Sequence, residues 1–184
     1  MLSDEGAVPV FGSLPRVSPR LPFTWCAGRV AAEAGTGRRG GPGGPGTLCS
    51  MLTISQDLVD KIIAHARADH PDEACGVIAG RGGVPERFVP MENAERSPTF
   101  YRFDSMEQLR VWREMDDRDE EPVVIYHSHT ATEAYPSRTD VSYASEPNAH
   151  YVLVSTREDL GEKVELRSYR IVDGVITEEE VTIT

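Results

Sequence analysis

The first 50 residues differ so strongly in composition from the rest that they limit where this chain can build a core. They hold 10 of the 16 glycines and six of the 13 prolines, and residues 40–46 contain only these two types. Such a segment buries too little apolar surface to offset the entropy cost of folding. The sequence therefore predicts a disordered extension over residues 1–50 and a folded domain over residues 51–184.

The extension also differs in charge. Five arginines against three acidic residues give it a charge of +2, so the formal charge of −11 leaves −13 for residues 51–184. It has no lysine, asparagine, isoleucine or tyrosine, the residues with AT-rich codons, and Met51 opens the patterned part. We expect Met51 to be the true start and the extension to be translated upstream sequence. The alternative is a genuine flexible tail.

Charge and cysteine content exclude several classes of function. An acidic chain lacks the basic face that nucleic-acid binding requires, so no nucleic-acid partner is expected. The three cysteines, Cys26, Cys49 and Cys75, have no regular spacing, which argues against a disulfide framework and favours the cytoplasm. No signal peptide and no apolar run of about 18 residues is present, so no membrane partner is expected.

Helical and extended patterns alternate after Met51. Ser55 is expected to cap a helix that ends at His70-Pro71, and a second helix begins at Asp104 or Ser105. Its apolar side should hold Met106, Leu109, Trp112 and Met115. Strands are expected near residues 74–80, 87–91, 122–126, 149–155, 163–172 and 175–183, with a tight hairpin at 173–174. This order indicates an α/β or α+β fold with a central sheet.

His127-Ser128-His129 follows the apolar strand at residues 122–126. Side chains alternate along a strand, so the two histidines share a face and Ser128 points the other way. This geometry favours a shared metal ion. The alternative is a pair of histidines with separate structural partners.

Ser137 and Asp140 follow shortly after. With His127 and His129, Asp140 would supply the three protein ligands of a catalytic zinc ion, which leaves one position for water. Such a site also needs a carboxylate base and a hydrogen-bond donor for the attacked oxygen, and Ser137 is placed for the second role. Ser137 and Asp140 also have the spacing of a helix capping box, so Asp140 either binds metal or caps.

The whole constellation resembles the signature of the JAMM or MPN-plus metalloprotease domain: an upstream glutamate, His-Ser-His, seven residues, Ser, two residues and Asp. The resemblance runs from about Ile54 to the end. It implies a mixed central β-sheet flanked by helices, as in cytidine deaminases, and one zinc ion per chain. It also implies zinc ligation by His127, His129 and Asp140, with Glu73 as general acid and base. Ser137 would then stabilise the tetrahedral intermediate.

Residues 92–103 and 130–136 are similar to a bacterial subgroup that frees cysteine from a ubiquitin-like sulfur-carrier protein. The resemblance implies hydrolysis of the amide bond between the Gly-Gly tail of the carrier and cysteine, a step of cysteine biosynthesis. One alternative is a JAMM isopeptidase or processing protease acting on other ubiquitin-like conjugates. Another is a non-catalytic MPN scaffold.

Four further residues are candidates for contact with the substrate. Phe100, Tyr101 and Arg102 would line the groove for the carrier tail, and Glu133 would reach the cysteine amine. Simple packing of the aromatic loop and a solvated glutamate are the alternatives. The remaining histidines and Cys75 are expected to lie outside the metal site, with His65 facing solvent and Cys75 in the core.

Overall fold

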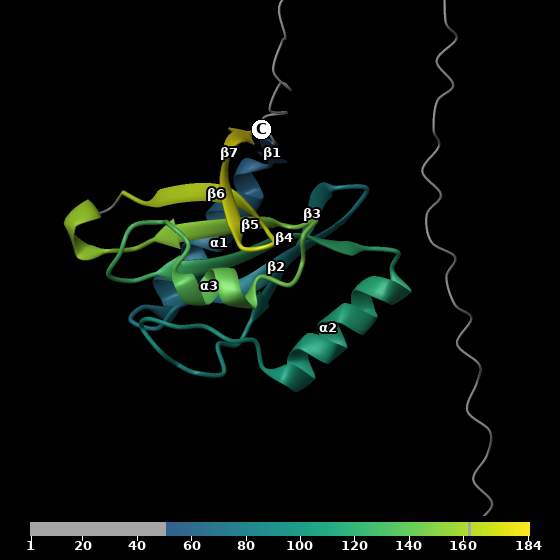
Figure 1. Ribbon diagram of the computed structural model, residues 1–184, viewed down its shortest axis with the longest axis horizontal. Coiled ribbons are helices and arrows are strands. Elements are labelled where there is room, and N and C mark those ends of the chain that lie inside the picture. The colour runs from purple at the N-terminus through teal and green to yellow at the C-terminus, as the bar shows by residue number, and fades with distance from the viewer. Residues whose placement is uncertain (1–50, 162) are drawn as a thin grey trace, which may run out of the picture. The chain divides into compact units, whose positions relative to one another are not determined.

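The computed structural model describes residues 51–161 and 163–184, so the expectations for residues 1–50 lie outside the described residues. A seven-stranded mixed sheet runs through the domain in the order β1-β7-β6-β5-β4-β2-β3. The β1/β7 and β4/β5 pairs are parallel and the other neighbours are antiparallel. The mixed sheet with flanking helices confirms the predicted fold class (Figure 1).

The elements follow one another in a simple order. The strands are β1 (Met51–Ile54), β2 (Cys75–Arg81), β3 (Val84–Met91), β4 (Glu121–His129), β5 (His150–Ser155), β6 (Glu165–Val172) and β7 (Val175–Ile183). The helices are α1 (Gln56–Asp69), α2 (Ser105–Asp117), α3 (Arg138–Tyr143) and a 3-10 turn, η1 (Glu158–Leu160). None of the helices in this described part combines the length and the hydropathy that a membrane crossing requires.

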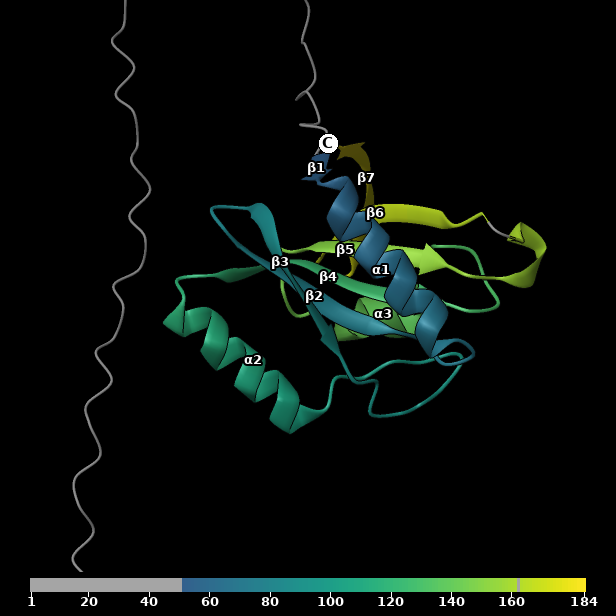
Figure 2. The same ribbon diagram turned by 180° about the vertical axis from the view of Figure 1, so that it is seen from behind.

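Helices cover both faces of the sheet. α1 packs on one face through Leu58 and Ile62, against Val124 and Tyr126 of β4. Figure 2 shows α1 in front of the sheet, whereas Figure 1 shows α3 on the opposite side. Because side chains alternate along β4, Ile125 lies on the α3 face, and the histidines that follow share that face.

Helix α2 begins at the predicted cap, since the Asp104 carboxylate accepts hydrogen bonds from two backbone amides of the first turn. The predicted buried face is confirmed for Met115 and for the partly buried Trp112, which both pack in the core, but it is wrong for Met106 and Leu109. Met106 and Leu109 are 74% and 45% exposed, and the buried residues are Val111 and Met115. At about 100° per residue, Met106 and Leu109 lie roughly 140° and 160° around the helix from Val111.

Two ends of the sheet also differ from the expectation. β3 begins at Val84, because an edge strand tolerates the missing amide of Pro85. β1 was not predicted. It is a four-residue strand whose pairing partner, β7, is the last strand of the sequence. The predicted hairpin is confirmed, with Asp173 and Gly174 at positive φ of 51° and 77°.

Candidate metal centre

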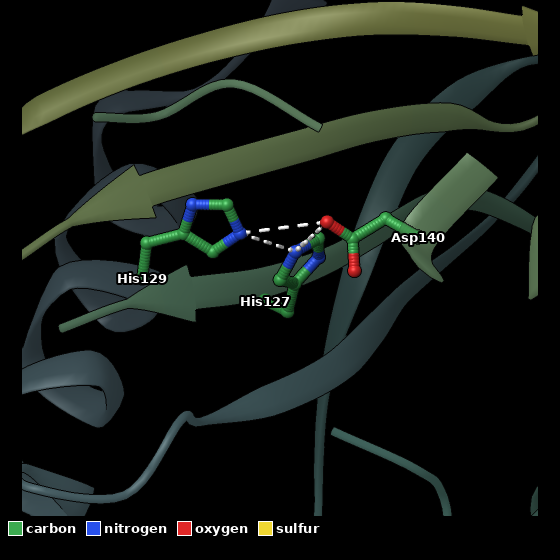
Figure 3. A group of neighbouring side chains, drawn as sticks. All are labelled: His127, His129 and Asp140. Carbon is green, nitrogen blue, oxygen red and sulfur yellow. Dashed lines mark hydrogen bonds and ion pairs between the residues drawn. The ribbon is translucent and has the colours of Figure 1, made fainter. Parts of the chain in front are cut away.

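The two histidines of β4 turn toward each other at the end of the strand. Their Nε2 atoms lie 3.2 Å apart, and both side chains are buried. The predicted shared face is therefore confirmed. Figure 3 shows both rings converging on the carboxylate of Asp140.

Asp140 comes from the first turn of α3. Its Oδ2 atom lies 3.5 Å from Nε2 of His127 and 3.5 Å from Nε2 of His129. The same oxygen accepts a 2.6 Å hydrogen bond from the Ser137 amide, while the Ser137 hydroxyl accepts one from the Asp140 amide at 3.2 Å. The capping box and the metal-site geometry therefore coexist, because α3 is capped in a way that aims Asp140 at the histidines.

These three donor atoms have the spacing that a zinc ion requires. Tetrahedral ligands about 2.05 Å from zinc lie about 3.3 Å from one another. The observed separations of 3.2, 3.5 and 3.5 Å are close to that value. Two imidazoles and a carboxylate also form the donor set of a catalytic zinc site that keeps its fourth position for water. The residues present fit a zinc ion.

Two of the three groups, His127 and Asp140, have the protonation states that metal binding requires. Burial lowers the pKa of His127 and outweighs its hydrogen bond to Asp140. Burial alone would raise the pKa of Asp140, but hydrogen bonds from His127 and His129 hold it well below its ordinary value. For His129, hydrogen bonds to Asp140 and to the Glu133 carbonyl outweigh burial and raise the pKa. Asp140 is thus ionised and His127 neutral near pH 7.

The two rings are held in different ways. Nδ1 of His129 lies 2.8 Å from the Glu133 carbonyl oxygen, and a carbonyl can only accept. In the neutral ring, His129 Nδ1 therefore carries the proton, which leaves the lone pair of Nε2 for the metal site. Nδ1 of His127 is buried and has no hydrogen-bond partner among the described residues. Its ring instead stacks on Tyr101, with centroids 4.4 Å apart and planes at 25°.

Glu73 lies beside His129, on the segment that pairs with β4. Cys75 pairs with His127 in the antiparallel β2–β4 ladder, and the Ser128 amide donates to the Ala74 carbonyl at 2.9 Å. Continuing this register places Glu73 opposite His129, on the face of the sheet that carries the metal site. The carboxylate is brought there by a pairing between segments 54 residues apart.

Glu73 is a buried carboxyl group with a raised pKa. The residue is only 5% exposed, and its pKa is raised to about 7, chiefly because burial disfavours the charged form. The charge of His129 opposes this rise and that of Asp140 adds to it. A base with a pKa near the working pH both accepts and returns a proton efficiently. The alternative of a surface glutamate does not hold.

Ser137 is exposed at the start of α3, directly beside Asp140. Its hydroxyl accepts the capping hydrogen bond through a lone pair, which leaves the hydroxyl proton free to donate. Capping and stabilisation of an oxyanion are therefore compatible roles for this residue.

Two of the four candidate substrate residues line a cavity of about 400 Å³ between α2 and α3. Tyr101 and Arg102 line it, and Phe100 packs against Tyr143 of its wall with ring centroids 5.7 Å apart. Tyr101 combines this position with its packing on His127. Glu133 is exposed, and its backbone carbonyl accepts a hydrogen bond from His129.

The remaining histidines and Cys75 lie outside the three-residue cluster. Cys75 is fully buried, as expected, and burial raises the pKa of its thiol. The expectation for His65 is wrong, because Nδ1 of this partly buried ring lies 2.8 Å from the Tyr126 hydroxyl. His150 also has a partner, the Glu179 carboxylate at 2.6 Å.

Sequence reasoning missed two residues of the centre. Ser128 accepts a hydrogen bond from the Ala74 amide through its hydroxyl, and Asn93 donates one to the Glu73 carbonyl at 2.9 Å. Alternation along β4 indicated that Ser128 points away from the metal, but no local signal identifies the strand it meets. Asn93 lies in the loop after β3, where nothing in the sequence indicates burial.

Several known proteins are similar to this chain in sequence or in structure. A CysO-cysteine peptidase of Mycobacterium tuberculosis is 70% identical over 135 residues, which cover 72% of this chain and 91% of that protein. A desampylase of Haloferax volcanii is 32% identical over 113 residues, covering 58% of this chain and 81% of that protein. A protein of Desulfitobacterium hafniense solved in solution is 32% identical, has a TM-score of 0.64, and is matched over 73% of this chain and 93% of that chain.

A family defined as prokaryotic homologues of the JAB domain matches residues 55–172, a span that includes every strand from β2 to β6 and all the candidate metal ligands. The match agrees with the JAMM resemblance of the sequence. This chain belongs to the family of prokaryotic JAB domain homologues.

Proposed function

We propose that this protein is a zinc-dependent hydrolase that releases cysteine from the C-terminal glycine of a ubiquitin-like sulfur-carrier protein. The observation that carries the proposal is the convergence of His127, His129 and Asp140 beside the buried Glu73 carboxylate. The 70% identity to a CysO-cysteine peptidase supports the choice of a carrier-cysteine adduct as the substrate.

His127, His129 and Asp140 would hold one zinc ion per chain. When bound, zinc would polarise the scissile carbonyl and lower the pKa of the attacking water to about 7. Asp140 enters as a carboxylate and His127 as a neutral imidazole, so binding requires little proton release from these two.

Glu73 transfers the proton. It accepts a proton from the attacking water as the water oxygen bonds to the glycine carbonyl carbon, and returns it to the departing amine as the C–N bond breaks. The products are the carrier with a free C-terminal carboxylate and free cysteine. Ser137 donates its hydroxyl proton toward the negative charge that develops on the carbonyl oxygen.

The cavity between α2 and α3 would receive the carrier tail, with Tyr101 and Arg102 in its wall and Phe100 behind Tyr143. Glu133, exposed on the other side of His129, would face the amine of the cysteine. Since a thiol product suits a reducing compartment, we place the reaction in the cytoplasm. No nucleic acid or membrane takes part.

The test compares two substrates of the same carrier, one with cysteine amide-linked to the terminal glycine and one with lysine linked through its ε-amine. The zinc-loaded protein should release cysteine with a higher kcat/KM than lysine, measured by mass spectrometry of the carrier. Glu73→Gln is the matched control, because it keeps the size of the side chain without the base. Preference for the lysine conjugate would support the isopeptidase alternative, and cleavage of neither would support a scaffold.

A further inference from the structure

The loop between β3 and α2 carries a buried asparagine whose hydrogen bonds are all satisfied by the backbone. Asn93 is 5% exposed. Its Nδ2 donates to the carbonyls of Glu73 at 2.9 Å and Phe100 at 3.0 Å. Its Oδ1 accepts from the amides of Glu95 at 3.1 Å and Arg102 at 3.3 Å. A primary amide has two donor hydrogens and two acceptor lone pairs, so its capacity is fully used.

Two of these bonds bracket Tyr101. The Phe100 carbonyl belongs to the peptide before Tyr101, and the Arg102 amide belongs to the peptide after it. A bridge between Asn93 and Phe103, and the hydrogen bond from the residue-94 amide to the Arg102 carbonyl at 2.9 Å, close the same part of the loop. The backbone of Tyr101 is therefore fixed on both sides by one side chain.

Tyr101 in turn packs on His127, the candidate ligand whose second ring nitrogen is not held by a hydrogen bond among the described residues. Its ring stacks on His127 at 4.4 Å, whereas Nδ1 of His127 has no hydrogen-bond partner in the described part of the chain. His129 differs, because the Glu133 carbonyl fixes its ring. A histidine that binds metal usually has its second nitrogen held by a hydrogen bond, which fixes the orientation of the ring. In His127 the stacked Tyr101 ring restrains that orientation instead.

A further hydrogen bond of the Asn93 side chain is made to the backbone of Glu73, the proposed base. The carbonyl of Glu73 accepts from Asn93, and its amide donates to the Ser97 carbonyl of the same loop at 2.9 Å. Both peptide groups of Glu73 are thus tied to the loop rather than to the sheet alone.

We propose that Asn93 is a positioning residue for the hydrolase, which holds the Glu73 backbone and the Tyr101 ring in one unit and so sets the orientation of His127. The proposal rests on the proposed function for the roles of zinc and Glu73. Its effect should appear in two separate quantities, zinc affinity through Tyr101 and proton transfer through Glu73.

Asn93→Asp is the sharpest test, because it keeps the shape but replaces the two donor hydrogens by an acceptor that faces two carbonyls. Zinc affinity, measured by competition with a chromogenic chelator, should fall about 10-fold to 100-fold. The kcat of the zinc-saturated variant should fall by a similar factor, while KM for the carrier-cysteine adduct stays within about twofold.

Substitutions of Tyr101 test whether its stacking on His127 supports zinc binding. They remain informative if Asn93→Asp does not fold. Tyr101→Phe keeps the stacked ring and should keep the zinc affinity, whereas Tyr101→Leu should lower it about 10-fold. Equal zinc affinities in the two variants would overturn the proposal.

Ile171→Ala is the control for general destabilisation, because Ile171 is buried in β6 beyond the residues that pair with β5. It should lower stability without changing zinc affinity or kcat. Asn93→Asp with wild-type zinc affinity and kcat, or with losses no larger than those of Ile171→Ala, would also overturn the proposal. Zinc affinity needs no substrate, so failure to cleave the carrier adduct would refute the proposed function separately.

Discussion

Ser128 and Ala74 are joined by a pair of hydrogen bonds: the Ser128 hydroxyl accepts from the Ala74 amide at 2.8 Å, and the Ser128 amide donates to the Ala74 carbonyl at 2.9 Å. The serine between the two histidines therefore points away from the metal site and holds the residue next to Glu73. β4 thus presents two of the three candidate metal ligands on one face, and the side chain between them holds the residue next to the proposed base.

Ser128→Ala should impair both stability and turnover. The change leaves the buried Ala74 amide without an acceptor, which should lower the free energy of unfolding by about 1–3 kcal/mol. Displacement of Glu73 should reduce kcat about 10-fold to 100-fold. Urea unfolding and steady-state kinetics check this, with Ser128→Thr as the control that keeps a hydroxyl. A Ser128→Ala variant with unchanged kcat would show that the Ala74 contact does not position Glu73.

Glu73→Gln should separate metal binding from chemistry. The amide cannot accept the proton of water, so kcat should fall by about 100-fold to 10,000-fold. Zinc content, measured by elemental analysis, should remain at the wild-type level, because Glu73 is outside the three-residue cluster. Full activity of this variant would remove the proposed base.

Removal of a candidate ligand should abolish both zinc binding and turnover. His127→Ala and Asp140→Ala each leave two of the three donors, and both should lose zinc on dialysis against a weak chelator and lose turnover with it. His70→Ala is the control, because His70 is exposed at the end of α1 and lies outside the cluster. Retention of stoichiometric zinc by either ligand variant would contradict the assignment.

The local parts of the centre could be predicted from the sequence, and the non-local parts could not. Alternation places His127 and His129 on one face of β4, and short spacing brings Asp140 close, as the structure has them. Glu73 was identified only through family resemblance, because its position depends on pairing between β2 and β4. Asn93 had no signal, since its partners become neighbours only after the loop folds.

In the fold, too, local features could be predicted from the sequence and features that depend on distant partners could not. α1 and the β6–β7 hairpin carry their caps and turn residues locally, and both were predicted. β1 depends on a distant partner and was missed. For α2 the cap is correct, but the predicted buried face is correct only for Trp112 and Met115, because apolar residues lie on more than one side and only packing against the sheet chooses between them.

Two truncations test the buried face of α2. Met115→Ala removes a side chain that is 2% exposed and should lower the free energy of unfolding by about 2–5 kcal/mol. Leu109→Ala removes one that is 45% exposed and should change it by at most about 0.5 kcal/mol. Urea unfolding of the two variants checks this. Similar losses in both would indicate that Leu109 is also buried in solution.

Glu73 should make the stability of the metal-free protein depend on pH. Its pKa is about 7 in the folded state against an ordinary value of 4.5, because burial disfavours the charged form. The folded state binds this proton more tightly, so the stabilising contribution is complete below pH 4.5 and is lost as pH rises through 7. At about 1.4 kcal/mol per pH unit, the loss reaches on the order of 3 kcal/mol.

Glu73→Gln isolates this contribution, because the amide does not titrate and the other groups of the site remain. Urea unfolding of the metal-free proteins between pH 5 and pH 8 should show the variant gaining stability relative to wild type by about 2–3 kcal/mol over this range. Added zinc should flatten the difference, since a nearby cation lowers the pKa of a carboxyl group. A constant difference between the two metal-free proteins across this range would mean that Glu73 is not buried in its neutral form.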